Sequence, residues 1–319
     1  MAVTGYRTGL ISGALAMALV GSSAAVSPLL TDYPVLAGQA WRYTAAAFLL
    51  LGYLWLRRLP WVRVGRSDWV RLALLAATGL AAFNVCLLQA ARYTDPPVLG
   101  AIVGAAPLVL AISGPLLAGR RPSPLVATSA VIVVVGVGIV LGGGHFSLPG
   151  VLWSLGALAG ECLFSLLAVP LLPRLGPVRV SAYTCALAGV MLAVAALLVE
   201  RGDVATVPTG VEVLSLAFLA VFVTAVAFAL WYAAVGSLGV DRAGLLAGLV
   251  PVAATLIAVG IDTTTLSLQV LLGAVLVGAG VSLGMLPPRR RPGGGAAGHE
   301  GQRPASRRSA PVEQVGGLP

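Results

Sequence analysis

The sequence contains no lysine, and charged residues of all kinds make up only 10% of its 319 residues. A water-soluble chain of this length needs far more charged and polar side chains to cover its surface. Hydrophobic residues instead make up 58% of the chain, and the mean hydropathy is +0.97. This composition excludes a soluble globular protein and indicates a chain that is surrounded mostly by lipid.

Catalytic and metal-binding patterns are also missing. The three cysteines, Cys86, Cys162 and Cys185, lie in apolar stretches without the spacing of metal ligands, so we interpret them as small packing residues. The sequence has no HExxH motif, no P-loop and no paired carboxylates within its apolar stretches. We therefore expect no enzyme activity, no catalytic residues, no cofactor, no metal and no ATP-driven pump.

Long apolar stretches recur along most of the chain. A stretch of about 20 apolar residues is long enough to cross a bilayer core about 30 Å thick, and spanning segments this long are helices because they must satisfy their own backbone hydrogen bonds. The sequence predicts an all-α polytopic membrane protein with ten transmembrane helices, at residues 8–30, 34–56, 70–91, 97–118, 125–142, 150–172, 180–199, 213–235, 243–261 and 268–286.

The positions of the arginines predict the orientation. If the N-terminus is cytoplasmic, every arginine except Arg42, Arg92 and Arg201 falls on the cytoplasmic side. The positive-inside rule therefore predicts a multi-pass protein of the plasma membrane with both termini in the cytoplasm. The net charge of +9 is mostly this asymmetry, so we expect no nucleic acid partner.

A short pattern occurs twice, as GAIVGAAPL from Gly100 and GLLAGLVPV from Gly244. An offset of 144 residues superposes Gly100, Gly104 and Pro107 on Gly244, Gly248 and Pro251. Five predicted spans separate the copies, and an odd number places equivalent loops on opposite sides of the membrane. We therefore predict two inverted five-helix repeats, residues 1–145 and 146–286, followed by a disordered cytoplasmic tail at 287–319.

The repeated pattern has two readings. Glycines four residues apart let another helix approach closely, and a proline within a span permits a kink. The six residues therefore either serve tight packing alone or also act as hinges or line a cavity.

Two long segments of the chain resemble a known family. Residues 83–117, beginning FNVCLLQAARYTDPP, and residues 227–284, beginning AFALWYAAVGSLGVD, are similar to the third and fourth and the eighth to tenth helices of EamA-type permeases of the drug/metabolite transporter superfamily. The WRY of residues 41–43 resembles an aromatic-arginine stretch in their second helix. The family's Gly-Glu after the fourth and ninth helices is absent, since Arg120 follows Gly119 and the second copy has Ile261 and Asp262.

Polar groups near the middle of the spans are the candidate site. Burying an ionised side chain there costs at least about 2.5 to 3.5 kcal/mol, so we expect Arg42 and Glu161 to face protein or water and to border one cavity. Arg42 either recognises substrate or snorkels to the headgroups or forms a structural ion pair. Glu161 either carries a substrate or proton role or is a packing residue. Asn84 is either a ligand contact or an interhelical hydrogen-bond partner. Helical spacing places Thr224, Phe228, Trp231 and Tyr232 on one broad face of the eighth predicted span, and near its cytoplasmic end Trp231 and Tyr232 are interpreted as an interfacial aromatic belt.

The sequence and the resemblance together predict a secondary transporter, in the family's export direction, that moves a small organic metabolite or drug by alternating access. A proton gradient is the candidate energy source. The partners are the small-molecule substrate and the lipid bilayer, and a homo-oligomer is left open. The alternative is a non-transporting membrane-embedded scaffold or a lipid-processing protein.

The predicted topology can be tested with reporters. A reporter fused after Arg66 or in the tail is expected in the cytoplasm, and one inserted near Asp203 is expected outside, as measured by compartment-specific alkaline phosphatase and green fluorescent protein activity. A cytoplasmic Asp203 contradicts both the ten-span count and the inverted repeat.

Overall fold

The computed structural model describes residues 2–60, 62–262 and 267–286, and all regular secondary structure within these ranges is helical. The predicted tail at 287–319 lies outside the described residues. The described chain up to Leu286 forms one compact unit.

Eight helical stretches are long and apolar enough to cross a membrane. Several are composite, because short helices follow one another without a loop. The stretches are α1 (Ala2–Gly21) with α2 (Ser23–Val26) and η1 (Ser27–Leu30); α4 (Arg66–Leu75) with η2 (Ala76–Ala82) and α5 (Phe83–Ala90); α6 (Pro96–Val103) with α7 (Ala106–Leu117); α8 (Pro124–Leu141); α9 (Leu148–Leu166); α10 (Leu172–Val199); α11 (Gly210–Phe218) with η4 (Leu219–Val226) and α12 (Ala227–Leu238); and α13 (Val240–Leu246) with α14 (Leu249–Gly260). A short 3-10 turn, η3 (Arg201–Ala205), follows α10.

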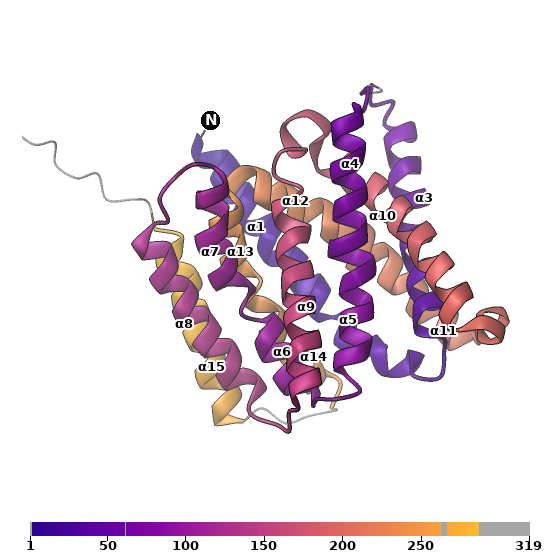
Figure 1. Ribbon diagram of the computed structural model, residues 1–319. Helices are drawn as coiled ribbons and strands as arrows, with labels where there is room; N and C mark the ends of the chain where they lie inside the picture. The colour runs from indigo at the N-terminus through magenta and orange to yellow at the C-terminus, as the bar shows by residue number, and fades with distance from the viewer. Residues whose placement is uncertain (1, 61, 263–266, 287–319) are drawn as a thin grey trace, which may run out of the picture. The chain divides into compact units, whose positions relative to one another are not determined.

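Two further helices lie beside these stretches. Helix α3 (Val35–Leu56) carries Gln39 and Arg42 in its first half and packs along α10. Helix α15 (Leu268–Gly284) has 17 residues and packs along α8 (Figure 1). The ten-span count stays a prediction, since these two helices fall outside the eight.

The order of helices repeats at the offset of 144 residues that relates Gly100 to Gly244. The stretch α4–η2–α5 recurs as α11–η4–α12, the pair α6–α7 recurs as α13–α14, and α8 recurs as α15. Both η2 and η4 are π-helical. Because π-helical turns are rare, their recurrence at equivalent positions is stronger evidence of a structural repeat than matching glycines are.

The repeated glycine-proline pattern interrupts its helices. Helix α6 ends at Val103 and α7 begins at Ala106, while α13 ends at Leu246 and α14 begins at Leu249. The sequence allowed for a kink within each of these spans, and the structure instead has one helix ending and another beginning there. The break falls just before each proline, because proline has no N–H to continue the hydrogen-bond ladder.

Glycines bring α8 and α15 into close contact. A Cβ placed on Gly136 would lie 2.8 Å from the amide nitrogen of Val277. The contact between the equivalent residues is also present, since a Cβ on Gly280 would lie 3.0 Å from the amide nitrogen of Val133. Each helix thus presents the same surface to its equivalent, which is the property of a two-fold interface.

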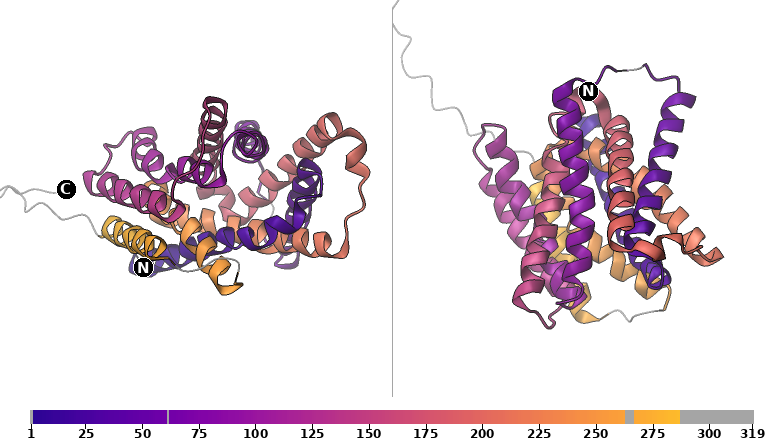
Figure 2. Two further views of the ribbon diagram at one scale, coloured as in Figure 1. Left: turned by 90° about the horizontal axis from the view of Figure 1, so that it is seen from below. Right: turned by 45° about the vertical axis from the view of Figure 1, so that its right-hand side comes forward.

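The equivalent helices run antiparallel. Ser129 at one end of the α8 contact lies beside Gly284, and Val140 at the other end lies beside Gly273, so numbers rise along α8 as they fall along α15. The equivalent pair α3 and α10 is also antiparallel, because the start of α3 contacts Glu200 at the end of α10. The α8–α15 and α3–α10 pairs lie at opposite edges of the described helices in both views of Figure 2.

Apolar side chains cover the outer faces of the helices. Phe48 is 71% exposed, Leu198 70% and Leu214 73%. A contiguous apolar surface of this kind is unfavourable in water and favourable in hydrocarbon. The chain is therefore a multi-pass membrane protein.

Close packing at the equivalent glycines predicts a paired effect on stability. Gly136→Ala and Gly280→Ala are each expected to destabilise the purified protein by about 1 to 3 kcal/mol, because the new methyl group meets backbone atoms of the facing helix. The measurement is thermal unfolding in detergent.

Two glycines of the same helices serve as matched controls. A Cβ on Gly138 or Gly278 would meet nothing within 4 Å, so Gly138→Ala and Gly278→Ala are expected to leave stability unchanged or slightly raised. Equal effects at all four positions are inconsistent with the packing described here.

Candidate functional site

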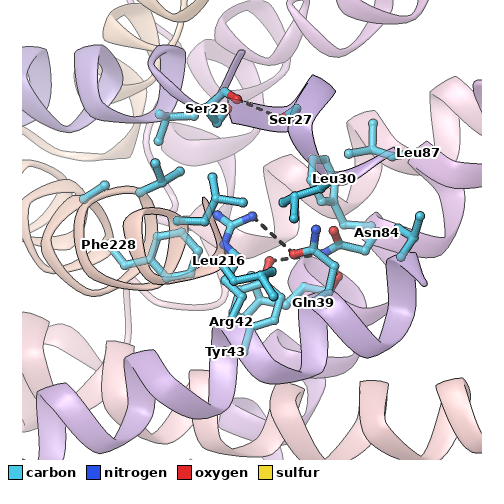
Figure 3. A pocket seen from close by; sticks show the side chains of 18 of the residues that line it. Ser23, Ser27, Leu30, Gln39, Arg42, Tyr43, Asn84, Leu87, Leu216 and Phe228 are labelled. Atoms are coloured by element: carbon cyan, nitrogen blue, oxygen red, sulfur yellow. Dashed lines mark hydrogen bonds between the residues drawn. The ribbon is translucent and has the colours of Figure 1, made fainter. Parts of the chain in front are cut away.

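A cavity of about 610 Å³ lies among the helices and contains all three polar residues that the sequence singled out. Arg42 on α3, Asn84 on α5 and Glu161 on α9 all line it. Figure 3 shows Arg42, Gln39 and Asn84 around this space, with Tyr43 and Phe228 forming part of its aromatic wall. Its volume suits a small organic molecule.

The two repeats contribute equivalent residues to the cavity wall. Six pairs of lining residues are related by the same offset of 144: Met17 with Glu161, Val20 with Phe164, Gly79 with Val223, Phe83 with Ala227, Asn84 with Phe228, and Leu87 with Trp231. The cavity therefore lies where the two repeats face each other. The polarity of the cavity wall does not follow the repeat, because the residues equivalent to Asn84 and Glu161 are the apolar residues Phe228 and Met17.

The cavity extends toward only one end of the bundle. We call the end with Arg57, Arg66, Arg120, Arg174 and Arg242 the arginine end. Lining residues continue to the other end, where Ser27 begins η1 and where Thr31, Tyr33 and Pro34 connect η1 to α3.

At that other end Tyr33 is a neutral part of the wall. Burial raises the pKa of its phenol, and the nearby carboxylates of Glu212 and Glu200 raise it further. The side chain therefore remains protonated around neutral pH.

Aromatic side chains close the cavity toward the arginine end. The indole nitrogen of Trp231 donates to the Ser165 hydroxyl at 3.1 Å, and the Tyr232 hydroxyl donates to the Phe164 carbonyl oxygen at 3.3 Å. Trp231 is 3% exposed and Tyr232 is fully buried. The predicted interfacial belt was wrong for these two residues, because their polar atoms find partners on α9 and their rings fill the interior.

An ion pair between Asp68 and Arg174 joins α4 to α10 at the arginine end. The guanidinium of Arg179 adds a hydrogen bond of 2.6 Å to the carbonyl oxygen of Pro60. These contacts hold the closed end together.

Arg42 is positioned by its helix and by two neutral partners. The start of α3 is capped by the Glu200 carboxylate, which accepts from the amide nitrogens of Leu36 and Ala37 at 2.7 and 2.9 Å. A carboxylate is well suited to the unpaired N–H groups of a helix N-terminus. The guanidinium donates to the Gln39 side-chain oxygen at 3.2 Å and to the Thr224 hydroxyl at 2.6 Å.

Asn84 links two helices as well as lining the cavity. Its side-chain nitrogen donates to the Tyr43 hydroxyl at 3.1 Å and to the Leu80 carbonyl oxygen at 2.8 Å. The side-chain oxygen is thus the group of Asn84 that stays available to a ligand. The structural role and the cavity role coexist at this residue, and its contact with substrate stays a prediction.

Glu161 faces the cavity without forming an ion pair with Arg42. Within the described part of the chain, Asp68 and Arg174 form the one salt bridge. The cavity therefore presents a cation and an acidic group that do not neutralise each other directly. Their roles in binding or coupling stay predictions.

The glycines and prolines of the repeated pattern lie outside the cavity wall. Gly104 packs against Val137, where a Cβ would lie 2.6 Å from a methyl carbon, and Gly244 packs at 3.0 Å against the Leu110 side chain. Gly100 and Gly248 also contact neighbouring helices, and Pro107 is buried at the start of α7. Tight packing is therefore one function of the pattern, and the hinge function stays a prediction.

The part of the chain that the structure describes has no cluster of three or more metal-ligating side chains. The cysteines Cys162 and Cys185 are buried, Cys86 is partly buried, and all three are free thiols. They pack as small residues, as the sequence predicted.

Sequence reasoning missed Gln39 and Ser165, and it placed Thr224 on one face with Phe228 and Trp231 without finding its partner. Gln39 lies three residues before Arg42, a spacing at which side chains on one helix meet. The hydrogen bond between them could therefore have been predicted from the sequence. Ser165 carried no such signal, because it is a single hydroxyl in an apolar run. The partners of Thr224 and Ser165 were out of reach, since they lie 182 and 66 residues away in the chain.

Comparisons with known proteins identify a family, a relative and a similar fold. The model of the EamA-like transporter family matches residues 7–142 and again residues 148–286. The uncharacterized transporter YetK of Bacillus subtilis (strain 168) is 27% identical over 255 residues, which cover 77% of each chain. A solved crystal structure described only as that of a protein has a TM-score of 0.76 and 21% identity, covering 88% of this chain and 96% of the other. At that identity, the solved structure supports the fold alone.

The broken helices predict a role for the two equivalent prolines. The double variant Pro107→Ala and Pro251→Ala is expected to insert normally but to transport more slowly, because alanine allows each helix to continue through its break. The measurements are the amount of protein in isolated membranes and the rate of release of its substrate from cells.

Pro115 lies in the same helix as Pro107 and has no equivalent proline, so Pro115→Ala is the matched control. If the double variant transports at the wild-type rate, the repeated pattern serves helix packing alone and does not act as a hinge.

Proposed function

Since the chain belongs to the EamA-like transporter family, we propose that it is a secondary transporter that exports a small organic metabolite or drug across the plasma membrane. The observation that carries this proposal is the cavity between the two repeats, lined by equivalent residues of both and closed at one end. A site at the interface of two related halves can be exposed first to one side and then to the other.

The proposal includes ten spans and an inverted repeat. Support comes from the helices α3 and α15, which bring the first and the second repeat to five helical stretches each, and from the antiparallel course of α8 with α15 and of α3 with α10. Equivalent helices of an inverted repeat must cross the membrane in opposite directions. The two family matches, which meet between residues 142 and 148, agree with repeats at 1–145 and 146–286.

The arginine end is cytoplasmic in this proposal. The positive-inside rule places arginine-rich connections there, and both termini follow because α1 begins and α15 ends at this end, where the Tyr6 hydroxyl donates to the Met285 carbonyl oxygen at 2.6 Å. The contacts of Trp231, Tyr232 and Asp68 then form a closed inner gate. The described conformation is accordingly the one that faces outward.

The charged groups define what the cavity recognises. A guanidinium keeps its charge at physiological pH and binds carboxylates through paired N–H groups, so Arg42 selects a substrate with an anionic group. Glu161 is an acid that can exchange a proton during the cycle, which makes a proton gradient the proposed energy source. Aromatic and aliphatic wall residues, among them Tyr43, Phe228 and Leu216, accommodate the rest of the substrate.

Metabolite release tests this function. Cells that produce the wild-type protein are expected to release at least one organic metabolite faster than cells without it, as measured by untargeted mass spectrometry of the medium. The released compound is then tested in proteoliposomes with an imposed pH gradient. Equal release from both cells leaves the scaffold or lipid-processing alternative, as does a released compound that shows no flux in proteoliposomes.

Two cavity variants separate binding from coupling. Arg42→Ala is expected to weaken the apparent affinity for the released compound at least about tenfold, because it removes charged hydrogen bonds. Glu161→Gln is expected to preserve the fold and to flatten the pH dependence of transport, because an amide does not titrate. Both are measured as transport rates against substrate concentration and pH.

Arg120→Ala, which alters an exposed arginine outside the cavity, is the control for a general charge effect. An unchanged pH profile in Glu161→Gln overturns the coupling role.

A further inference from the structure

We propose that Thr224 is a positioning residue, which holds the Arg42 guanidinium from the opposite repeat and directs its remaining N–H groups to the substrate. Thr224 belongs to the second repeat and Arg42 to the first, and the Thr224 hydroxyl accepts from Arg42 Nε at 2.6 Å. The consequence for substrate binding rests on the proposed function. The contact itself does not depend on it.

The π-helical turn determines how the Thr224 hydroxyl is oriented. Thr224 is fully buried in η4, and its hydroxyl donates to the Leu219 carbonyl oxygen, five residues earlier, at 2.9 Å. Hydroxyls in α-helical stretches donate four residues back, as Ser129 of α8 does to the Leu125 carbonyl oxygen at 2.8 Å. A hydroxyl can donate only one hydrogen bond. Because the Thr224 hydroxyl donates it to the Leu219 carbonyl oxygen, only its lone pairs are left to interact with Arg42. The side chain is thus a fixed acceptor.

Two acceptors then hold the plane of the guanidinium. Thr224 accepts from Nε and Gln39 accepts from Nη1, while the Arg42 Cζ lies 5.3 Å from the centre of the Tyr43 ring. A guanidinium has five N–H donors in one plane, so these two bonds leave three in a fixed direction. Neither acceptor is charged. The positive charge therefore stays available for an anionic group in the cavity.

This arrangement occurs once in the two repeats. The residue equivalent to Thr224 is Leu80 in η2, and the residue equivalent to Arg42 is Ala186 in α10. The hydrogen bond is thus a departure from the repeat that connects its halves, rather than part of the packing they share.

Arginine side-chain NMR tests the position of Arg42 without a known substrate. The probe is protein labelled with 15N-arginine in lipid nanodiscs, and the Arg42 Nε–H signal is the one that Arg42→Lys removes. Thr224→Val, which keeps the shape and loses the acceptor, is expected to speed exchange of that proton with water at least about tenfold. Thr224→Ser is expected to stay within about twofold of wild type.

Thr78→Val is the matched control, since it removes a hydroxyl from the equivalent π-helical segment that has no arginine partner. Unchanged Arg42 exchange in Thr224→Val overturns the proposal, as does an equal increase in Thr78→Val. Should Thr224→Val not fold, Thr224→Cys is used, and its weakly accepting thiol is expected to give the same direction of change.

Transport provides the second readout. Thr224→Val is expected to raise the concentration for half-maximal transport of the compound found by metabolite release, with a smaller effect on the maximal rate, and Thr224→Ser is expected to restore it. If wild-type cells release no compound, the transport function fails while the exchange measurement still decides the position of Arg42.

Discussion

A permanent positive charge inside an apolar helix bundle is the constraint on which the site depends. Placing an arginine at the middle of a span costs at least about 2.5 to 3.5 kcal/mol, and no carboxylate within the described residues pairs with Arg42. The cost is offset by neutral acceptors on two helices and by the cavity that the guanidinium borders. This compensation requires α3 and η4 to meet beside the cavity, which the packing of the two repeats provides.

Symmetry and asymmetry have separate roles in this protein. The backbone follows the repeat closely, down to the π-helical turns, the broken helices and the reciprocal glycine contacts of α8 and α15. Polar chemistry does not follow it, because the equivalents of Arg42, Asn84 and Glu161 are Ala186, Phe228 and Met17. In the proposed transport cycle, a symmetric scaffold allows two related conformations of similar energy, and the single set of polar groups serves as the proposed binding site in both.

Sequence reasoning reached the helices and part of the site. Spans, small-residue contacts and the polar groups near midspan follow from hydropathy and spacing, and Arg42 and Glu161 do line one cavity. It failed where a local pattern had two structural outcomes. Trp231 near the end of a span has the position of a belt residue, yet its indole bonds Ser165 in the interior. The breaks before Pro107 and Pro251 were likewise expected only as kinks.

The sequence by itself determined that this protein is surrounded by lipid, that its arginines are unevenly distributed among the connections between helices, and that a repeat exists. These properties depend on composition and on the order of residues along the chain. Only the tertiary structure decided which hydroxyl holds Arg42 and which end of the cavity is closed. Both depend on contacts between residues far apart in the chain, such as Arg42 with Thr224, and on the added residue in a π-helical turn that sets the direction of a side chain. Helical periodicity carries no information about either.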